Sequence, residues 1–416
     1  MGKKGYIGLL LLVALLMPQQ SWAVDIHGRS STQFLTFIND FNNTRETDIG
    51  QYLLLNVTNI DKEGKFSVYG YGRGIQDLNN GNGIDGRLYY LYGEYRDLFD
   101  IADLRFGRQF INLSAGSAII DGLQVNLKNI GPVGFTAVGG RDVIFGLNGE
   151  TGYGGNMDFG LSAYLLGFNK TQLDVSWLRK WDHDDVSRDT IGGNFNQYLF
   201  NNMRLYANAR YDINAEVFSE VLAGVKYFPM SNLIFTGEWY QSYPTFDATS
   251  IYSVFAVNRY QEYLFRADYT INQFVSVHGG YTKEDFGDNS TSDVVELGVS
   301  LRPIDKLAIH LSYDRTSGYS GDLNGGMLDV TYDASKDLRL STGMTYDVFN
   351  RDDLLPINTN GTDFVSSPTE TAQRYYVGGR YRLTKNMQAT LRIDDLESDT
   401  RNSSDVSGRF VIDYDF

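Results

Sequence analysis

The chain ends in the stretch SGRFVIDYDF, residues 407–416, in which two kinds of side chain alternate. Side chains two positions apart share one face of a β-strand, whereas neighbouring side chains point to opposite faces. One face of this strand carries large apolar groups, namely Phe410, Ile412, Tyr414 and Phe416. The other face carries Ser407, Arg409, Val411, Asp413 and Asp415. Such a strand fits a wall that separates an apolar medium from water.

Segments with the same alternation recur along the chain. RLYANARY (204–211), LAIHLSYD (307–314) and MQATLRID (387–394) each place apolar or aromatic residues on one face and mostly polar residues on the other. The connections alternate as well, because tight turns such as 61–65 are followed by connections that are mostly longer, such as 350–371. Short turns at one end and longer loops at the other are typical of outer-membrane barrels.

This pattern predicts an all-β fold, a transmembrane antiparallel up-and-down β-barrel of about 22 strands, within a range of about 18 to 24. The range reflects residues 101–134, which are hard to divide into strands. No apolar run after the first 23 residues reaches the roughly 18–20 residues of a spanning helix, so a closed sheet is the remaining way to cross a bilayer. About 22 tilted strands predict a backbone diameter of roughly 40 Å.

Residues 1–23 have the pattern of a secretory signal peptide. Lys3 and Lys4 precede an apolar core at 6–16, and Pro18 and a small-x-small site at 21–23 follow it. We therefore expect a signal peptide over 1–23 and a barrel over 24–416. Because a strand-like segment begins at residue 25, we expect no plug domain in front of the barrel.

Composition argues against several functional classes. The net charge of −15, without basic clusters, argues against nucleic acid as a partner. The chain has no Cys and four His, and it lacks a G-x-S-x-G motif, so we expect no enzyme and no covalently attached haem. His183 lies among Asp182, Asp184 and Asp185, where a solvated acidic loop is the simpler interpretation, and we expect no metal site and no cofactor.

With these features, the chain resembles the bacterial outer-membrane porin superfamily. The resemblance rests on the architecture of 24–416, on the terminal FVIDYDF, and on LRFGRQF (104–110) followed by IIDGLQV (119–125). It implies a bacterial outer-membrane location, contact with lipid and lipopolysaccharide, and recognition by the barrel-assembly machinery. The residues expected to form the assembly signal are Phe410, Ile412, Tyr414 and Phe416.

The faces expected to line the lumen carry charges of both signs. The last strands present a basic wall with Arg374, Arg380, Arg382, Arg392 and Arg409. An earlier mixed patch contains Glu238, Glu262, Arg266, Glu296 and Arg302. Such charges select ions and orient polar solutes, or they form cross-strand pairs that stiffen a wet wall.

Two functions remain open from the sequence. The first is a plain diffusion porin for small polar or ionic solutes. The second follows from the predicted width, since large barrels without a plug resemble the outer-membrane component of porin–cytochrome electron conduits. In that case the chain would be a sheath around a multihaem c-type cytochrome, and the partner would carry all the haem.

Overall fold

The structure is a computed structural model that describes residues 24–39, 44–79, 83–146, 149–150, 155–246, 258–319, 321–350, 369–399 and 405–416. The expected signal peptide and most of the long connection at 350–371 lie outside the described residues. Within the described residues, no helix is long and apolar enough to cross a membrane.

The barrel wall consists of 22 strands. The first half contains β1 (Asp25–Asn39), β2 (Thr44–Thr58), β3 (Phe66–Asp77), β4 (Asp85–Leu98), β5 (Ala102–Leu113), β6 (Gly116–Ile130), β7 (Val133–Asp142), β10 (Met157–Phe168), β11 (Thr171–Asp182), β12 (Asp185–Leu199) and β13 (Met203–Asp212). The second half contains β14 (Val217–Met230), β15 (Leu233–Ser242), β16 (Tyr260–Asn272), β17 (Val275–Asp285), β18 (Thr291–Ile304), β19 (Leu307–Gly318), β20 (Asp322–Asp333), β21 (Leu338–Asn350), β22 (Thr369–Arg382), β23 (Met387–Ser398) and β24 (Asp405–Asp415). A separate short hairpin is formed by β8 (Phe145–Gly146) and β9 (Gly149–Glu150).

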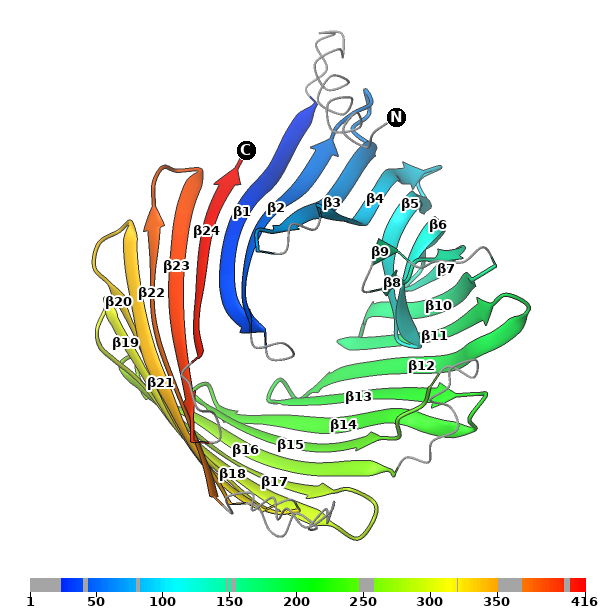
Figure 1. Ribbon diagram of the computed structural model, residues 1–416. Coiled ribbons are helices and arrows are strands. Elements are labelled where there is room, and N and C mark those ends of the chain that lie inside the picture. Colours follow the sequence, from blue (N-terminus) through cyan, green and yellow to red (C-terminus); the bar gives the residue numbers. More distant parts are fainter. Residues whose placement is uncertain are drawn as a thin grey trace, which may run out of the picture.

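The sheet closes on itself, as Figure 1 shows. Wall strands that follow one another in sequence pair antiparallel, and β1 pairs with β24 from Arg29 opposite Asp415 to Thr36 opposite Gly408. The prediction of a closed antiparallel barrel of about 22 strands is therefore confirmed. The segment that the sequence left undivided resolves into β5, β6 and the start of β7.

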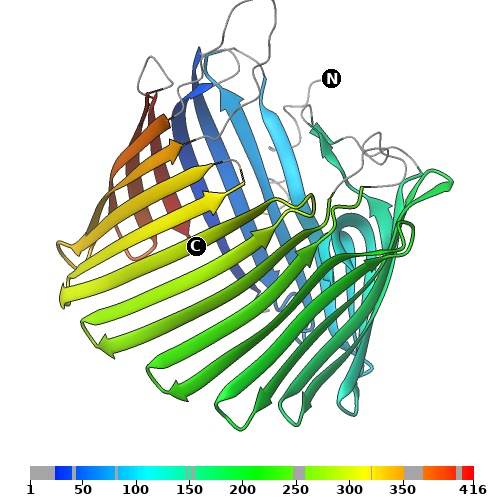
Figure 2. The ribbon, with the colours of Figure 1, turned by 90° about the horizontal axis from the view of Figure 1, so that it is seen from below.

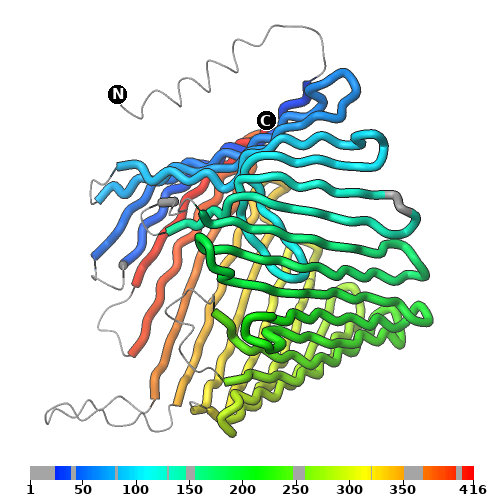
Figure 3. Tube along the Cα trace, turned by 90° about the vertical axis from the view of Figure 1, so that its right-hand side faces the viewer, coloured from blue at the N-terminus to red at the C-terminus, as the bar shows by residue number. Residues whose placement is uncertain are grey.

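Connections alternate between the two ends of the barrel (Figures 2 and 3). We call the end that holds Gly28 and Phe416 the turn end and the opposite end the loop end. At the turn end, strands join through short turns, for example between β12 and β13 and between β18 and β19. The loop end holds the longer connections and also several tight ones, for example after β5, β11 and β13.

The barrel is sealed at the turn end of its seam. The amide of Gly28 donates to the carbonyl of Phe416 (2.9 Å), and the amide of Phe416 donates back to Gly28 (3.1 Å). A Cβ on Gly28 would lie 2.5 Å from the ring of Phe416, so only glycine leaves room for this ring. The last residue of the chain thus closes the ladder with the first strand.

One face of the sheet is mainly apolar around the ring, and toward the loop end it also carries charged pairs such as Arg108 with Asp121 and Arg179 with Asp189. Residues directly opposite each other in a ladder share a face, and Phe34, Phe410 and Leu391 follow one another across β1, β24 and β23. The same parity continues through every pair of neighbouring strands. The aromatic residues Tyr211, Tyr227, Trp239, Tyr313, Tyr332, Tyr346 and Tyr381 all fall on this face. An apolar band with aromatic residues suits the boundary between lipid and water.

Candidate functional site

The lumenal face is identified by contacts across the concave side of the sheet. Ile111 of β5 and Leu178 of β11 belong to one buried cluster, although three strands separate β5 from β11 in the sheet. Side chains from such distant strands meet only inside a closed barrel. Leu178 shares its face with Asp174 of β11, which lies opposite Asn194 of β12. The polar face is therefore the inner one.

The hairpin between β5 and β6 bends into the lumen and contacts β11 and β12. We call residues 113–116 the lumenal tip. Ser176 Oγ of β11 lies 2.6 Å from Ser114 Oγ and accepts a hydrogen bond from the amide of Ala115 (2.7 Å). Thr190 Oγ1 of β12 donates to the carbonyl of Ala115 (3.0 Å). A Cβ on Gly192 would lie 2.2 Å from the carbonyl of Ser114, so glycine is required where the lumenal tip touches the wall.

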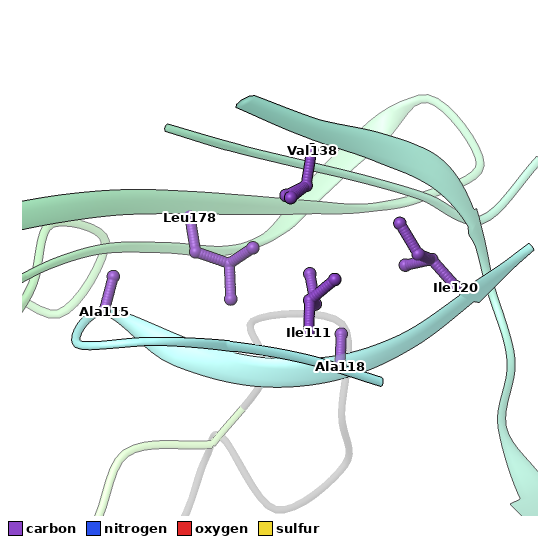
Figure 4. Close-up of a cluster of buried hydrophobic side chains, with 6 residues drawn as sticks. All are labelled: Ile111, Ala115, Ala118, Ile120, Val138 and Leu178. Atoms are coloured by element: carbon purple, nitrogen blue, oxygen red, sulfur yellow. The ribbon is translucent and has the colours of Figure 1, made fainter. Parts of the chain in front are cut away.

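Apolar side chains fill the space between this hairpin and the wall. Figure 4 shows six of them pointing toward one another: Ile111, Ala115, Ala118, Ile120, Val138 and Leu178. Ile120 is 0% exposed and Leu178 is 1% exposed. We call this group the lumenal cluster. Burial of several aliphatic side chains holds the hairpin in place, because each contributes about 1.5–3 kcal/mol relative to exposure.

The hairpin of β8 and β9 also lies inside the ring, against β4 (Figure 1). Arg87 Nη2 donates to the carbonyl of Gly146 (3.3 Å), and the ring of Phe145 lies 5.8 Å from that of Tyr89. The register of the ladder between β3 and β4 shifts beside Tyr90, where β4 has one extra residue. This bulge lets Tyr89 and Tyr90 both contact Tyr71. Two segments therefore narrow the lumen along the arc from β4 to β12.

The ladder registers place nine of the ten predicted lumenal residues on the inner face, and the tenth, Arg302, lies at a register shift in β18. Arg374 and Arg392 converge on Asp394, with distances of 3.4 and 2.8 Å. Arg409 Nη2 donates to Gln33 Oε1 (2.9 Å). Arg380 and Arg382 form no ion pair among the described residues. Their contact with a solute stays a prediction.

The mixed patch is brought together only in part. Arg266 lies 3.0 Å from Asp268 and 3.6 Å from Glu296, which also contacts His278 (3.0 Å). The other members are apart from this group. Glu238 accepts from Tyr206 of β13, Glu262 accepts from Tyr260 (3.1 Å), and Arg302 lies on β18 toward the turn end. Seven of the ten predicted lumenal residues therefore already have an ion-pair or hydrogen-bond partner for the side chain.

The acidic segment around His183 lies at the tight connection between β11 and β12. His183 Nδ1 is 2.8 Å from Asp182 Oδ1, and the His183 side chain is 62% exposed. Among the described residues, no group of three His, Cys, Asp or Glu side chains is arranged to hold a metal ion.

Sequence reasoning missed the lumenal tip and the lumenal cluster. The available signal was the pair Ile119 and Ile120, which places an isoleucine on each face of β6. Apolar residues on both faces of a strand indicate that something packs on the inner face as well as on the outer one.

Comparison with solved structures identifies proteins that share this fold, whereas comparison with family models and curated proteins finds no match. No family model and no curated protein matches the chain. Its structure is similar to the ferric enterobactin receptor PfeA mutant of Pseudomonas aeruginosa, with a TM-score of 0.61 and 12% identity over 95% of this chain and 81% of that one. It is also similar to the P pilus usher PapC translocation pore (TM-score 0.50, 11% identity, 93% and 99% covered). For Pseudomonas aeruginosa OpdQ the TM-score is 0.46 and the identity 13%, over 94% and 99%.

The closed ring and the similarity to PfeA and PapC define the class of protein by its fold. It is a closed, antiparallel, up-and-down β-barrel. The described residues from Asp25 onward belong to the wall, to its connections, or to the β8–β9 hairpin, and none of them forms a plug domain.

Proposed function

We propose that the chain forms a wide, water-filled channel through which small polar or ionic solutes cross the outer membrane. One observation carries this proposal, namely the parity of the ladders, which keeps one face mainly apolar and the other mainly polar around the ring. Hydrocarbon outside and water inside are the two media that such a wall separates. The outer face then contacts lipid and lipopolysaccharide, and the barrel-assembly machinery recognises the last strand.

The pairing of charges on the inner wall supports weak rather than strong ion selectivity. Arg266, Arg374 and Arg392 each lie within 4 Å of a carboxylate. A paired charge produces a smaller field in the pore than an isolated one. Purified barrel in a planar bilayer should give stable conductance steps with little preference between small cations and anions. Absence of conductance from correctly folded barrel would refute the channel.

The proposed orientation places the loop end outside the cell. The chain has no Cys, so a single introduced cysteine reports its own position. Asp184 is exposed at the loop end and Glu63 is exposed at the turn end. An impermeant maleimide should label D184C in intact cells and E63C only after the outer membrane is breached. The opposite pattern would reverse the orientation.

A second candidate is a sheath around a multihaem cytochrome. It is supported by the position of the two inward-folded segments, the lumenal tip and the β8–β9 hairpin, which both lie against the arc from β4 to β12. In the described part of the chain they leave the inner wall uncovered from β14 through β24 to β3. A wall that mixes Tyr and Arg suits a protein interface. Any haem would belong to the partner, because the chain has no Cys.

Native purification separates the two candidates. A sheath should co-purify with a haem-staining protein, and the empty barrel should give very large or erratic currents. A plain diffusion channel should purify without haem and give regular steps. Regular steps together with the absence of a haem partner would remove the sheath from consideration.

A further inference from the structure

A hollow of about 560 Å³ lies between the lumenal tip and the barrel wall, on the turn side of the lumenal cluster. We call it the alcove. Six of the residues that line it are Leu113, Gln124, Ser162, Tyr164, Asn194 and Asn208. Its volume falls within the range of about 300–1,000 Å³ that is usual for small-molecule pockets. The alcove exists because the tip crosses to β11 and β12 instead of continuing along the wall.

The charged groups around the alcove are already engaged. Arg105 Nε lies 2.7 Å from Glu94, and Arg210 Nη1 lies 3.1 Å from Glu220. Asp174 Oδ2 accepts a hydrogen bond from Ser162 Oγ (2.5 Å). Both arginines are therefore paired with carboxylates, and the carboxylate of Asp174 is the charge that the alcove retains.

Its amide groups, in contrast, retain hydrogen-bonding capacity. Asn194 of β12 lies directly opposite Asn208 of β13, so the two amides are neighbours on the wall. Asn208 Oδ1 and Arg210 Nε are buried without a hydrogen-bond partner in the described part of the chain. Nor do Asn194 and Gln124 form a side-chain hydrogen bond to any residue that the structure describes. Leaving a buried group such as Asn208 Oδ1 unsatisfied costs about 1–3 kcal/mol, whereas Asn194 is exposed and Gln124 half-buried, so their amides are open to a solute.

We propose that the alcove binds a neutral, ring-shaped polyol of the size of a mono- or disaccharide during its passage through the barrel. An amide offers one group that donates and one that accepts, and each hydroxyl of a polyol does the same. Ile111, Leu113 and Val138 line the same hollow and offer aliphatic contact to the C–H groups of the ring. This inference rests on the proposed channel function, which supplies the route by which the solute reaches the alcove.

The test uses the purified full barrel and two probes, maltose and a polyethylene glycol of similar mass that lacks neighbouring hydroxyls. Maltose should reduce the single-channel current in a saturable manner, and the polyethylene glycol should not. In the double variant Asn194→Leu/Asn208→Leu, which keeps side-chain size but removes both amides, the half-blocking concentration should rise about tenfold or more. The control is Gln388→Leu, which removes an inward-facing amide of β23, outside the alcove, and should leave the block unchanged.

The outcomes distinguish this inference from the channel itself. Regular conductance with no saturable effect of maltose, or an equal loss in the Gln388→Leu control, would overturn the alcove and leave the channel intact. Absence of conductance would overturn the channel, and saturation-transfer NMR of maltose with the barrel in detergent would then test the alcove alone. If the double variant fails to fold, Gln124→Leu serves in its place, since Gln124 lines the same hollow from β6.

Discussion

The arc from β5 to β12 and the seam between β24 and β1 are held together in different ways. The arc has a packed interior, since the lumenal cluster fills the space under an inward-folded hairpin. The seam has its backbone ladder, the ring of Phe416 against Gly28, the ion pair between Arg29 and Asp415, and the hydrogen bond from Arg409 to Gln33. Closure by main-chain hydrogen bonds is shared by every strand of the barrel, whereas an apolar interior is a local addition that shapes the lumen.

Deletion of Phe416 should have the largest effect, because it acts on closure. It removes two backbone hydrogen bonds to Gly28, each of which contributes about 1 kcal/mol, and it removes the ring that packs there. We expect about a hundredfold less folded barrel in the outer membrane, measured by heat-modifiable mobility on gels. Phe416→Ala keeps the backbone pair and should lose less. Equal losses in both variants would show that the ring, and not the ladder, is what matters.

Leu178→Ala should have the next largest effect, because Leu178 is 1% exposed within the lumenal cluster. A cavity there should lower the free energy of unfolding by about 2–4 kcal/mol. The matched control is Leu391→Ala, on the lipid side of β23 and 47% exposed, where lipid fills the space and the loss should be smaller. Thermal unfolding in detergent measures both. If the two variants lost the same stability, the lumenal cluster would not be a core.

Gly192→Val tests how the lumenal tip is seated. The added side chain collides with the carbonyl of Ser114, so the tip should leave the wall at a cost of about 1–3 kcal/mol. Conductance should rise because the lumen widens. Gly193→Val is the control, since Gly193 faces outward and a Cβ there meets no atom closer than 3.5 Å. Equal conductance in both variants would contradict the assignment of the tip as a constriction.

Arg29→Gln should have the smallest effect. The ion pair with Asp415 has an N–O distance of 2.7 Å, but the two side chains are 51% and 52% exposed. Exposed pairs contribute less than about 1 kcal/mol, and salt screens them. Unfolding at low and high salt should show a small difference that disappears at high salt. A loss comparable to that of Phe416 deletion would mean that the seam depends on charge.

The sequence predicted the barrel because alternation is a local property that each strand shows by itself. The terminal strand, with Phe410 and Ile412 on one face and Asp413 on the other, is an example. The lumenal tip escaped prediction because it depends on a contact between Ser114 and Ser176, which are 62 residues apart. Neither the sequence around Ser114 nor the sequence around Ser176 indicates that these two residues are in contact. The alcove follows from the same contact, and for that reason its amides were not among the predicted lumenal residues.

The seam also has a kinetic consequence. The ion pair of Arg29 with Asp415 joins residues 386 positions apart. Bringing together such distant segments has a large loop-closure entropy, and contacts of this separation form slowly. Every other ladder in the wall can form between strands that are neighbours in sequence, but this one requires the first and the last strand of the chain at once. Closure is therefore expected to be the last and slowest step of folding, and until it occurs two strand edges remain open to pairing with other chains.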